Sequence, residues 1–503
     1  MSLAALVFPN QLFADHPALD HDLGQPDEVV LVEDDLFFRD EQYPARYHKL
    51  RLVLHRATMR RTADRLERDG HTVRYVAWAD RTSTADLLAQ LAEDGVTAVR
   101  YCEPVDFTLE KRLDQAARDA GIEREVLETP LFLNTRAENA DFFDGRKRYF
   151  MADFYKHQRR RFGLLIDEHG EPSGGQWSFD HDNRKKLTKK AIAEVPPVPT
   201  VEPDDYTEEA VRYVEEHFPD HLGESGPLPY PTTHEAAAHW LDVFVEERLD
   251  RFGPFEDAIE PGQSHFYHAV LTPMLNIGLV TPKQVLDAVM ARAGDTPAYA
   301  PIASLEGFVR QVIGWREFMR ATYDLEGVPM RTGNMWDFER DMPDAWYDGT
   351  TGLVPVDDVI RRVLKTGYAN HIERLMVLGG ALFLSRIHPR AVYRWFMELF
   401  VDAYDWVMVP NTYGMSQHAA GPLITTKPYM SGSNYLRKMS HYPRGDWEAE
   451  WDGLYWTFMR DYREEVEGYH RMSMLTGHLD RMGDEKLQAH EDAAQRYFDR
   501  VFG

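Results

Sequence analysis

The chain has 503 residues, enough for two or three domains, and 83 acidic against 57 basic residues give it a net charge of −26. This charge excludes a protein coated in basic surface, so any nucleic-acid site must be a confined cationic patch. The acidity fits either a saline cytoplasm or an arginine-rich, GC-rich coding bias. The single cysteine, Cys102, excludes a disulfide framework and any metal cluster held by several cysteines of one chain. With no long apolar run and no basic leader, we expect a cytoplasmic protein without a membrane span.

Residues 1–130 alternate short β-branched runs with amphipathic helical stretches, which predicts a doubly wound, mainly parallel α/β domain. The expected strands are 3–8, 29–33, 72–77, 98–102 and 124–127. The expected helices are 46–69, 83–94 and 109–120. No GxGxxG loop follows the first strand, so the dinucleotide-binding fingerprint is absent.

Residues 131–234 differ in composition and predict an interdomain linker with some helix. They hold a basic and aromatic stretch, RKRYFMADFYKHQRRRFG (146–163), then GGQWSFDHDNRKKLTKK (174–190) and two proline-rich segments. From 235 to 503 strand signals vanish and helical periodicity dominates, which predicts a large all-α domain. The expected helices are 235–251, 265–277, 282–293, 304–323, 356–385, 389–403 and 453–470.

Three segments of the helical half resemble the photolyase–cryptochrome flavoproteins. They are FGPFEDAIEPGQSHFYHAVLTPMLNIGLVTP (252–282), EGFVRQVIGWREFM (306–319), and the stretch from NHIERLM (370–376) to DWVMVPNTYGMSQ (405–417). The resemblance implies an α/β antenna domain, an all-α domain that binds FAD, and a light-driven reaction. Backbone N–H groups at helix starts suit the FAD phosphates.

The chain is most similar to the prokaryotic (6-4) photolyase-related subgroup, on the start LVFPNQLF, the helix YHKLRLVLHRATMRRTADRL, the linker GGQWSFDHDNRKK and the segment TKPYMSGSNYLRKMSHY. That subgroup carries a [4Fe–4S] cluster on four cysteines. Here the matching positions are near Pro355, Pro443, Asp446 and Ala449, so we expect no iron–sulfur cluster. Trp447 and Trp451 are expected to fill the vacated volume.

The resemblance implies a flavin site in the helical domain. An Arg374–Asp405 pair is expected to set the electrostatics of the flavin, and Asn411 to bond its N5. The implied FAD-binding residues are Gly253, Ser264, His265, Leu271, Asn276, Arg374, Asp405, Asn411 and Met415. A surface ion pair and an ordinary turn are the alternatives for these motifs.

His371 occupies the place of the catalytic histidine of (6-4) photolyases, where an imidazole can donate and return a proton. The neighbouring position, often also histidine in the subgroup, is Asn370, which weakens the assignment of the lesion. Trp395 and Trp346 are candidates for electron supply, with Trp406 and Tyr347 in the same half of the chain. Phe396 and Met415 stand where other members have redox-active aromatic residues. Packing is the alternative for each aromatic residue.

A flipped-out lesion needs an apolar pocket with a few polar groups and cations for the flanking phosphates. The expected contacts are Gln311, Trp315 and Arg316 in the pocket, and Arg184, Lys185, Lys186, Lys427, Arg437 and Lys438 around it. The resemblance also implies a 6,7-dimethyl-8-ribityllumazine antenna on Asn10, Gln11, Glu33, His48 and Lys49. A purely structural α/β domain is the alternative.

The sequence therefore predicts a monomeric DNA photolyase acting on damaged DNA, of the (6-4) type, with reduced FAD as electron donor. A cryptochrome-like photoreceptor that signals to a protein partner is the rival interpretation. A flavoprotein without photochemistry is disfavoured because no nicotinamide site is visible. DNA affinity with a negative salt slope would separate the first two.

Overall fold

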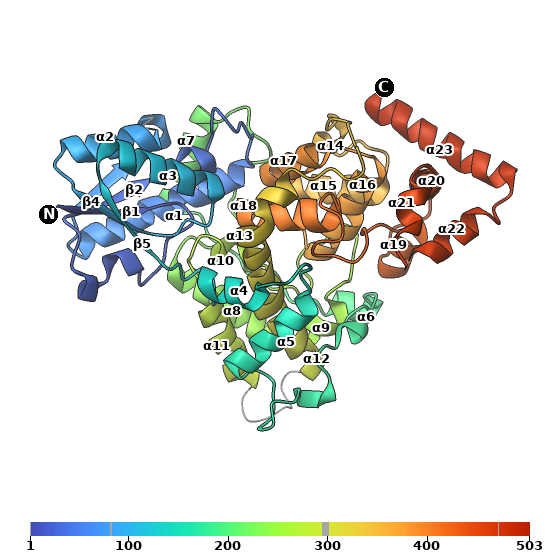
Figure 1. Cartoon of the computed structure of the whole chain (residues 1–503), viewed down its shortest axis with the longest axis horizontal. Coiled ribbons are helices and arrows are strands. Elements are labelled where there is room, and N and C mark those ends of the chain that lie inside the picture. The colour runs from blue at the N-terminus through green and yellow to red at the C-terminus, as the bar shows by residue number, and fades with distance from the viewer. Residues whose placement is uncertain (1, 81–82, 294–300, 471) are drawn as a thin grey trace.

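The computed structural model describes residues 2–80, 83–293, 301–470 and 472–503. The sheet domain forms one end of the long axis, and helices build the rest of the molecule (Figure 1). In the ranges given above, no helix is both long enough and apolar enough to cross a bilayer.

The N-terminal part is one five-stranded parallel sheet with the order β3-β2-β1-β4-β5. Its strands are β1 (Leu3–Val7), β2 (Glu28–Val32), β3 (Val73–Val76), β4 (Ala98–Cys102) and β5 (Glu123–Leu127). The central strands are continuous apolar runs because helices cover both faces of a parallel sheet. The five predicted strands and the doubly wound fold class are confirmed.

Three long helices connect these strands: α1 (Lys49–Arg68), α2 (Thr84–Glu93) and α3 (Phe107–Ala120). Each begins at a polar side chain that accepts a backbone N–H: His48, Ser83 and Asp106 respectively. The helix α3 ends at Gly121, whose φ of 67° is left-handed.

Beyond β5 the structure is helical. Before residue 235 it contains α4 (Arg136–Phe143), α5 (Met151–Phe162), α6 (Lys189–Ala193) and α7 (Asp205–His217). Then follow α8 (His234–Glu247), α9 (Leu249–Phe255), α10 (Thr272–Leu275), α11 (Pro282–Ala293), α12 (Ile302–Val309), α13 (Glu317–Arg331), α14 (Ala345–Asp348), α15 (Val354–Thr366), α16 (Gly380–Leu384), α17 (Pro389–Leu399), α18 (Asp405–Val409), α19 (Ser433–Met439), α20 (Asp446–Asp461), α21 (Arg463–Glu467), α22 (Ser473–Leu479) and α23 (Asp484–Phe502). Short 3₁₀ turns lie at Pro17–Leu19, His21–Leu23, Asp35–Phe37, Trp78–Asp80, Ser173–Gly175 and Asp180–Asp182.

Within the described residues, three π-helical segments interrupt the helices: η7 (Arg310–Arg316), η8 (Glu373–Gly379) and η9 (Pro410–Ser416). Three predicted helices are wrong in extent. Of 265–277 only α10 is helical, and 356–385 is broken between Thr366 and the helix that starts near His371. The stretch 453–470 is divided between α20, which starts earlier, and α21. Gly367, with a φ of 64°, ends α15.

The helix α1 docks the sheet domain onto the helical domain. The His48 N–H donates to the Glu398 carbonyl (2.6 Å), and the Lys49 N–H donates to the Leu222 carbonyl (2.8 Å). Arg56 on α1 binds Glu209 of α7, so the segment predicted as a linker returns to pack on the sheet domain. The predicted domain boundaries at 130 and 234 stay predictions.

Candidate functional site

A cavity of about 310 Å³ lies inside the helical part, and we call it the central cavity. This volume is at the lower end of the range for small-molecule sites. All three π-helical segments line it, and extra π turns occur frequently at functional sites because they re-aim side chains. The segment η7 supplies Gln311, Val312, Trp315 and Arg316; η8 supplies Arg374 and Leu375; η9 supplies Asn411, Thr412, Met415 and Ser416.

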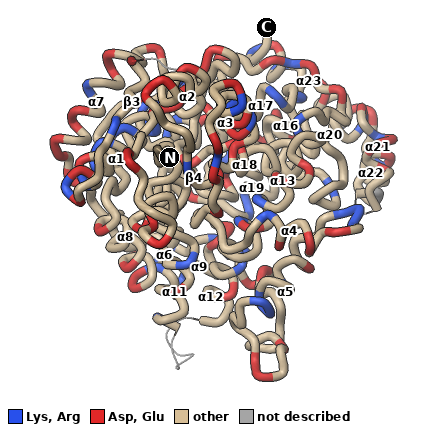
Figure 2. The backbone as a smooth tube through the Cα atoms, turned by 60° about the vertical axis from the view of Figure 1, so that its left-hand side comes forward, with Lys and Arg blue, Asp and Glu red and all other residues tan. Residues whose placement is uncertain are grey.

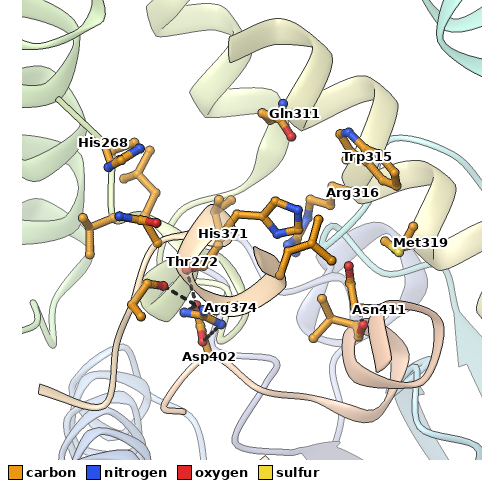
Figure 3. A pocket seen from close by; sticks show the side chains of 18 of the residues that line it. His268, Thr272, Gln311, Trp315, Arg316, Met319, His371, Arg374, Asp402 and Asn411 are labelled. Atoms are coloured by element: carbon orange, nitrogen blue, oxygen red, sulfur yellow. Dashed lines mark hydrogen bonds and ion pairs between the residues drawn. The ribbon is translucent and has the colours of Figure 1, made fainter. Parts of the chain in front are cut away.

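The side chains surround one space, as Figure 3 shows. His371 projects into its middle, Gln311, Trp315 and Arg316 follow one helix, and Arg374 meets Asp402 on the opposite side. The wall is mostly apolar, with Leu271, Phe308, Met319, Phe396 and Trp406 among the lining residues. Five of the nine predicted flavin residues therefore line the same cavity as the predicted lesion contacts Gln311, Trp315 and Arg316.

The buried ion pair of this cavity is Arg374–Asp402. The two guanidinium nitrogens donate to the Asp402 carboxylate at 2.8 and 2.9 Å. Burial alone would lower the pKa of Arg374, but the carboxylate raises it above its ordinary value, so the side chain stays cationic. Thr272 donates its hydroxyl to the same carboxylate, and Asn276 donates to the Asp402 carbonyl (2.9 Å).

The predicted pairing of Arg374 with Asp405 is wrong. Asp405 accepts hydrogen bonds from the hydroxyls of Tyr323 (2.6 Å) and Tyr393 and forms an ion pair with Arg331. Asp402 and Asp405 are three residues apart in VDAYDW, and α18 begins at Asp405. The turn before α18 directs Asp402 toward the cavity and Asp405 away from it. The spacing of residues in the sequence does not show which of the two aspartates faces Arg374.

Four buried nitrogens on cavity residues have no hydrogen-bond partner in the described part of the chain: Arg316 Nη2, Trp406 Nε1, Asn370 Nδ2 and His268 Nδ1. An unpaired buried donor costs about 1–3 kcal/mol. Arg316 also donates to Asn276 Oδ1 (2.7 Å), and its pKa is lowered to about 10 by burial, so it is charged at neutral pH. The cavity therefore suits a ligand that is largely flat and apolar and carries several hydrogen-bond acceptors.

His371 keeps an exposed face toward the cavity, although protein surrounds it. Burial, followed by the nearby charge of Arg374, lowers the pKa of His371 to about 4. The imidazole is therefore neutral at pH 7 in this environment and can accept a proton. Asn370 is buried and uses its side-chain oxygen to accept the Glu373 N–H (3.0 Å), which fixes the start of this helix.

Besides Asp405, three predicted flavin residues lie outside the lining of the central cavity. Gly253 lies against Ser304, where an added Cβ would be 2.7 Å from the serine Cα, so its role here is close packing of α9 on α12. Ser264 accepts a hydrogen bond from Arg362 (2.6 Å). His265 lines a small neighbouring pocket together with Trp240, and that pocket shares His268 with the central cavity.

The predicted electron donors form a buried line that starts at the cavity wall. Phe396 lines the cavity and lies 5.1 Å from Trp395, which lies 5.9 Å from Trp346, in each case between ring centroids. The Trp395 indole N–H donates to the Trp346 carbonyl (2.8 Å). Trp406 lines the cavity itself, and Tyr347 binds Glu398.

The cations predicted around the pocket differ in whether a carboxylate pairs with them and in how exposed they are. Arg184 pairs with Asp180, and Arg437 pairs with Glu448 (3.1 Å). Lys185 and Lys438 are exposed, while Lys427 and Lys186 are half-buried. Gln311 donates its amide to Glu256, whose pKa is raised to about 7 by burial.

The five residues predicted for the antenna have partners inside the protein. Glu33 binds Arg56 (2.9 Å), His48 contacts the Val363 and Leu364 carbonyls, and Lys49 binds Glu215 (3.0 Å). Asn10 and Gln11 donate to the carbonyls of Pro104 and Cys102 (2.8 and 2.7 Å). Among the buried polar atoms of these five side chains, Asn10 Oδ1 and Gln11 Oε1 have no hydrogen-bond partner in the described residues.

Sequence reasoning missed Asp402, Thr272 and His268 as cavity residues. The signal for Thr272 and His268 is their place within 252–282, the segment already singled out, but the irregular backbone between Glu256 and Thr272 hides which side chains face inward. Phe266 and Val270 have φ values of 37° and 49°, an uncommon conformation for residues other than glycine.

Two family models match the chain. The model described as deoxyribodipyrimidine photo-lyase-related protein matches residues 5–230, and the FAD binding domain of DNA photolyase matches residues 308–453. A protein named (6-4) photolyase from Agrobacterium fabrum is 32% identical over 499 residues, which cover 96% of this chain and 97% of that protein. The deoxyribodipyrimidine photo-lyase of Thermus thermophilus is 25% identical over 45% of this chain and 51% of its own length.

Solved structures share the fold at low sequence identity. A bacterial class III photolyase from Agrobacterium tumefaciens superposes with a TM-score of 0.58 at 15% identity, covering 100% of this chain and 96% of the other. A cryptochrome from Synechocystis sp. PCC6803 also gives 0.58, at 16% identity, with 87% and 88% covered. These likenesses confirm the fold class predicted from the sequence.

Proposed function

This chain belongs to the photolyase–cryptochrome family, and from that premise we propose that it is a light-driven DNA repair flavoprotein of the (6-4) photolyase type. Damaged DNA is its proposed partner, and the chain is proposed to act as a monomer in the cytoplasm. The observation that carries the proposal is the central cavity, where π-helical segments and the helix before η8 bring Trp315, His371 and Arg374 around one space.

FAD fits the residues of this cavity. The unpartnered donors Arg316 Nη2, Trp406 Nε1 and Asn370 Nδ2 would meet acceptor atoms of the cofactor, and the apolar wall suits its rings. His268 Nδ1 offers an acceptor instead, because Nε2 of that ring donates to the Glu256 carbonyl (2.9 Å). We propose that Arg316, Arg374, Asn276, Asn411, Leu271 and Met415 hold it. When bound, reduced FAD supplies the light-absorbing group and the electron that a lesion receives and returns.

The charged residues of the cavity are fixed before any ligand arrives. Asp402 clamps the Arg374 guanidinium through two hydrogen bonds, and Arg374 Nε donates to the Ala369 carbonyl (2.7 Å). Asn276 joins Asp402 to Arg316, so both cations are held by one network. Preorganised charges of this kind stabilise an anionic ligand without reorganisation at the moment of reaction.

His371 is the proposed catalytic residue for the (6-4) lesion, whose repair requires moving a hydroxyl or amino group between bases. Its imidazole is neutral at pH 7, so it carries one N–H and one free nitrogen lone pair and can hold or return a proton. An anionic ligand beside it would raise its pKa and favour the protonated form. Gln311, Trp315 and Arg316 are proposed to receive the flipped-out bases.

Trp395 and Trp346 are the proposed electron relay to the surface, with Phe396 between Trp395 and the cavity. Phenylalanine is not readily oxidised, so an electron must transfer from Trp395 to the cavity in one step, without oxidising Phe396. The edge-to-face contacts of the three rings support this route.

Of the five residues predicted to bind an antenna chromophore, only Asn10 and Gln11 are retained in the proposal. Glu33, His48 and Lys49 do not fit a chromophore site as they stand, because ion pairs and backbone carbonyls occupy their polar atoms. Asn10 and Gln11 follow β1 where it borders β4, and this reversal of strand order is where open α/β sheets bind ligands. We propose that a lumazine, if present, uses their free oxygens.

We also propose that the protein works without an iron–sulfur cluster, because its one cysteine lies in β4. Near Pro443, Trp447 and Trp451 are buried and meet edge to face at 6.4 Å. The indole N–H groups donate to the Pro443 and Ser431 carbonyls (2.9 and 2.8 Å). We propose that this packing stabilises the region without a cluster.

The test is to illuminate the purified, chemically reduced protein with an oligonucleotide that contains one (6-4) lesion and to separate the products by chromatography. We expect restored thymines with the wild type and none with H371A. H239A, a change of an exposed histidine on α8, is the matched control and should repair normally. A protein that photoreduces its flavin but leaves both this lesion and a cyclobutane dimer intact would refute repair and favour the photoreceptor interpretation.

A further inference from the structure

A basic stretch beside the central cavity has no part in the function proposed so far. Residues 146–161 contain seven arginines and lysines and one acidic residue, Asp153, in a chain of net charge −26. The stretch forms the turn before α5 and α5 itself. Figure 2 shows basic segments on this helix, while acidic segments are scattered over the other elements.

Five of these cations are open to solvent or to a ligand, and we call them the basic strip: Arg146, Lys147, Arg148, Lys156 and Arg160. All except half-buried Lys156 are exposed. None of the five forms an ion pair with a carboxylate of the described residues. Arg159 and Arg161 do not belong to the strip, because Arg159 binds backbone carbonyls and Arg161 binds Glu138.

The basic strip lies next to the residues proposed to receive the lesion. The helix α5 packs on η7 at Gly314, where an added Cβ would be 3.3 Å from the Tyr155 ring. Gly314 directly precedes Trp315 in the cavity wall. The helix that carries the strip is therefore a direct neighbour of the segment that lines the cavity.

Contacts at both ends join the strip to other cations. The Tyr149 N–H donates to the Leu423 carbonyl (3.1 Å), so the turn with Arg146, Lys147 and Arg148 adjoins the loop of Lys427. At the other end the Arg160 guanidinium lies 4.6 Å from the Trp177 ring centroid. Trp177 belongs to the segment 174–190, which also carries Arg184 and Lys185.

We propose that the basic strip binds the phosphates of the DNA on one side of the lesion. This inference rests on the proposed function, since it needs a DNA substrate. A helix of twelve residues such as α5 is about 18 Å long, which spans roughly five nucleotides at about 3.4 Å each. Screening limits repulsion from the acidic remainder, because the Debye length is about 8 Å at physiological salt.

The experiment measures DNA affinity as a function of salt for the triple variant K147Q/R148Q/K156Q. The matched control is K111Q/R118Q/R212Q, which removes the same charge from exposed positions of α3 and α7, away from α5 in Figures 1 and 2. Duplexes with and without one (6-4) lesion are both titrated. Circular dichroism verifies that the variants fold.

If the strip contacts phosphates, the slope of log K against log[salt] should become shallower by about 2 to 3 in the triple variant, since each contact contributes about 0.9. The change should be equal for both duplexes, leaving the lesion preference intact, and absent from the control. A triple variant with the wild-type slope overturns the inference while repair by the wild type still stands. A wild type that neither binds nor repairs lesion DNA overturns both proposals.

Discussion

The two aspartates of VDAYDW allow a sharp test of the cavity. D402A removes the carboxylate that binds Arg374 at 2.8 and 2.9 Å and accepts the Thr272 hydroxyl. The Arg374 side chain is 14% exposed, so it would be left as a nearly buried, unpaired charge. Breaking such a pair costs about 3–5 kcal/mol. We expect a loss of stability of that order and a purified protein with little bound FAD.

D405A is the matched comparison, since it removes an equally buried carboxylate three residues away. Its partner Arg331 is 37% exposed and can reach water, whereas Tyr323 and Tyr393 lose their acceptor. We expect a protein that is also destabilised but retains its flavin. The assay is the ratio of flavin to protein absorbance, with urea unfolding alongside, and D402N serves if D402A does not fold. Flavin loss in D405A together with full occupancy in D402A would refute the assignment of Asp402 to the cofactor site.

Three further changes test other parts of the structure. W395F should slow photoreduction of the bound flavin without changing lesion affinity, and an unchanged rate would exclude the Trp395 route. G253A should lower the free energy of unfolding in urea by about 1–3 kcal/mol, because its Cβ overlaps Ser304. Its flavin content should be normal, and flavin loss without destabilisation would contradict the packing role. For His48, burial lowers the pKa to about 4, so acidification from pH 6.5 to 4 protonates the unfolded chain first and removes up to about 3 kcal/mol of stability. In H48N the free energy of unfolding should fall less over that pH range than in the wild type. Identical pH profiles of the two proteins would contradict this role of His48.

The fold was predictable because its signals are local. Each strand of the sheet is a short β-branched run, and the helices between them begin at cap residues such as Ser83 and Asp106. The helical domain was predictable as a class from its periodicity. The stretch 265–277 was misread because its apolar residues have helical spacing, while Phe266 and Val270 adopt left-handed conformations that only the tertiary structure stabilises.

The site was predictable as a region but not as a set of contacts. Motif order identified Arg374, His371, Trp315 and Asn411, which all line one cavity. The acidic partner of Arg374 was misassigned because the family resemblance, through the six-residue spacing from Asp405 to Asn411, pointed to Asp405, whereas the turn before α18 places Asp402 against Arg374. The predicted antenna site stays a prediction. His48 contacts carbonyls of the helical domain and Glu33 binds Arg56 within the sheet domain, and a sequence does not distinguish such structural uses from ligand binding.

The π-helical segments lie where the polar residues of the cavity are concentrated. An i→i+5 turn adds a residue to the helical repeat, so side chains beyond it rotate relative to an α-helical projection. Gln311 and Trp315 in η7, and Asn411 and Met415 in η9, are each four residues apart, a spacing that keeps both side chains on one face, and all four line the same cavity. In η9 Gly414 permits this path, since an added Cβ would lie 2.6 Å from the Ile424 side chain. Each of the three segments brings at least one polar side chain and one apolar side chain to the same wall, a combination that suits a large flat ligand with polar edges.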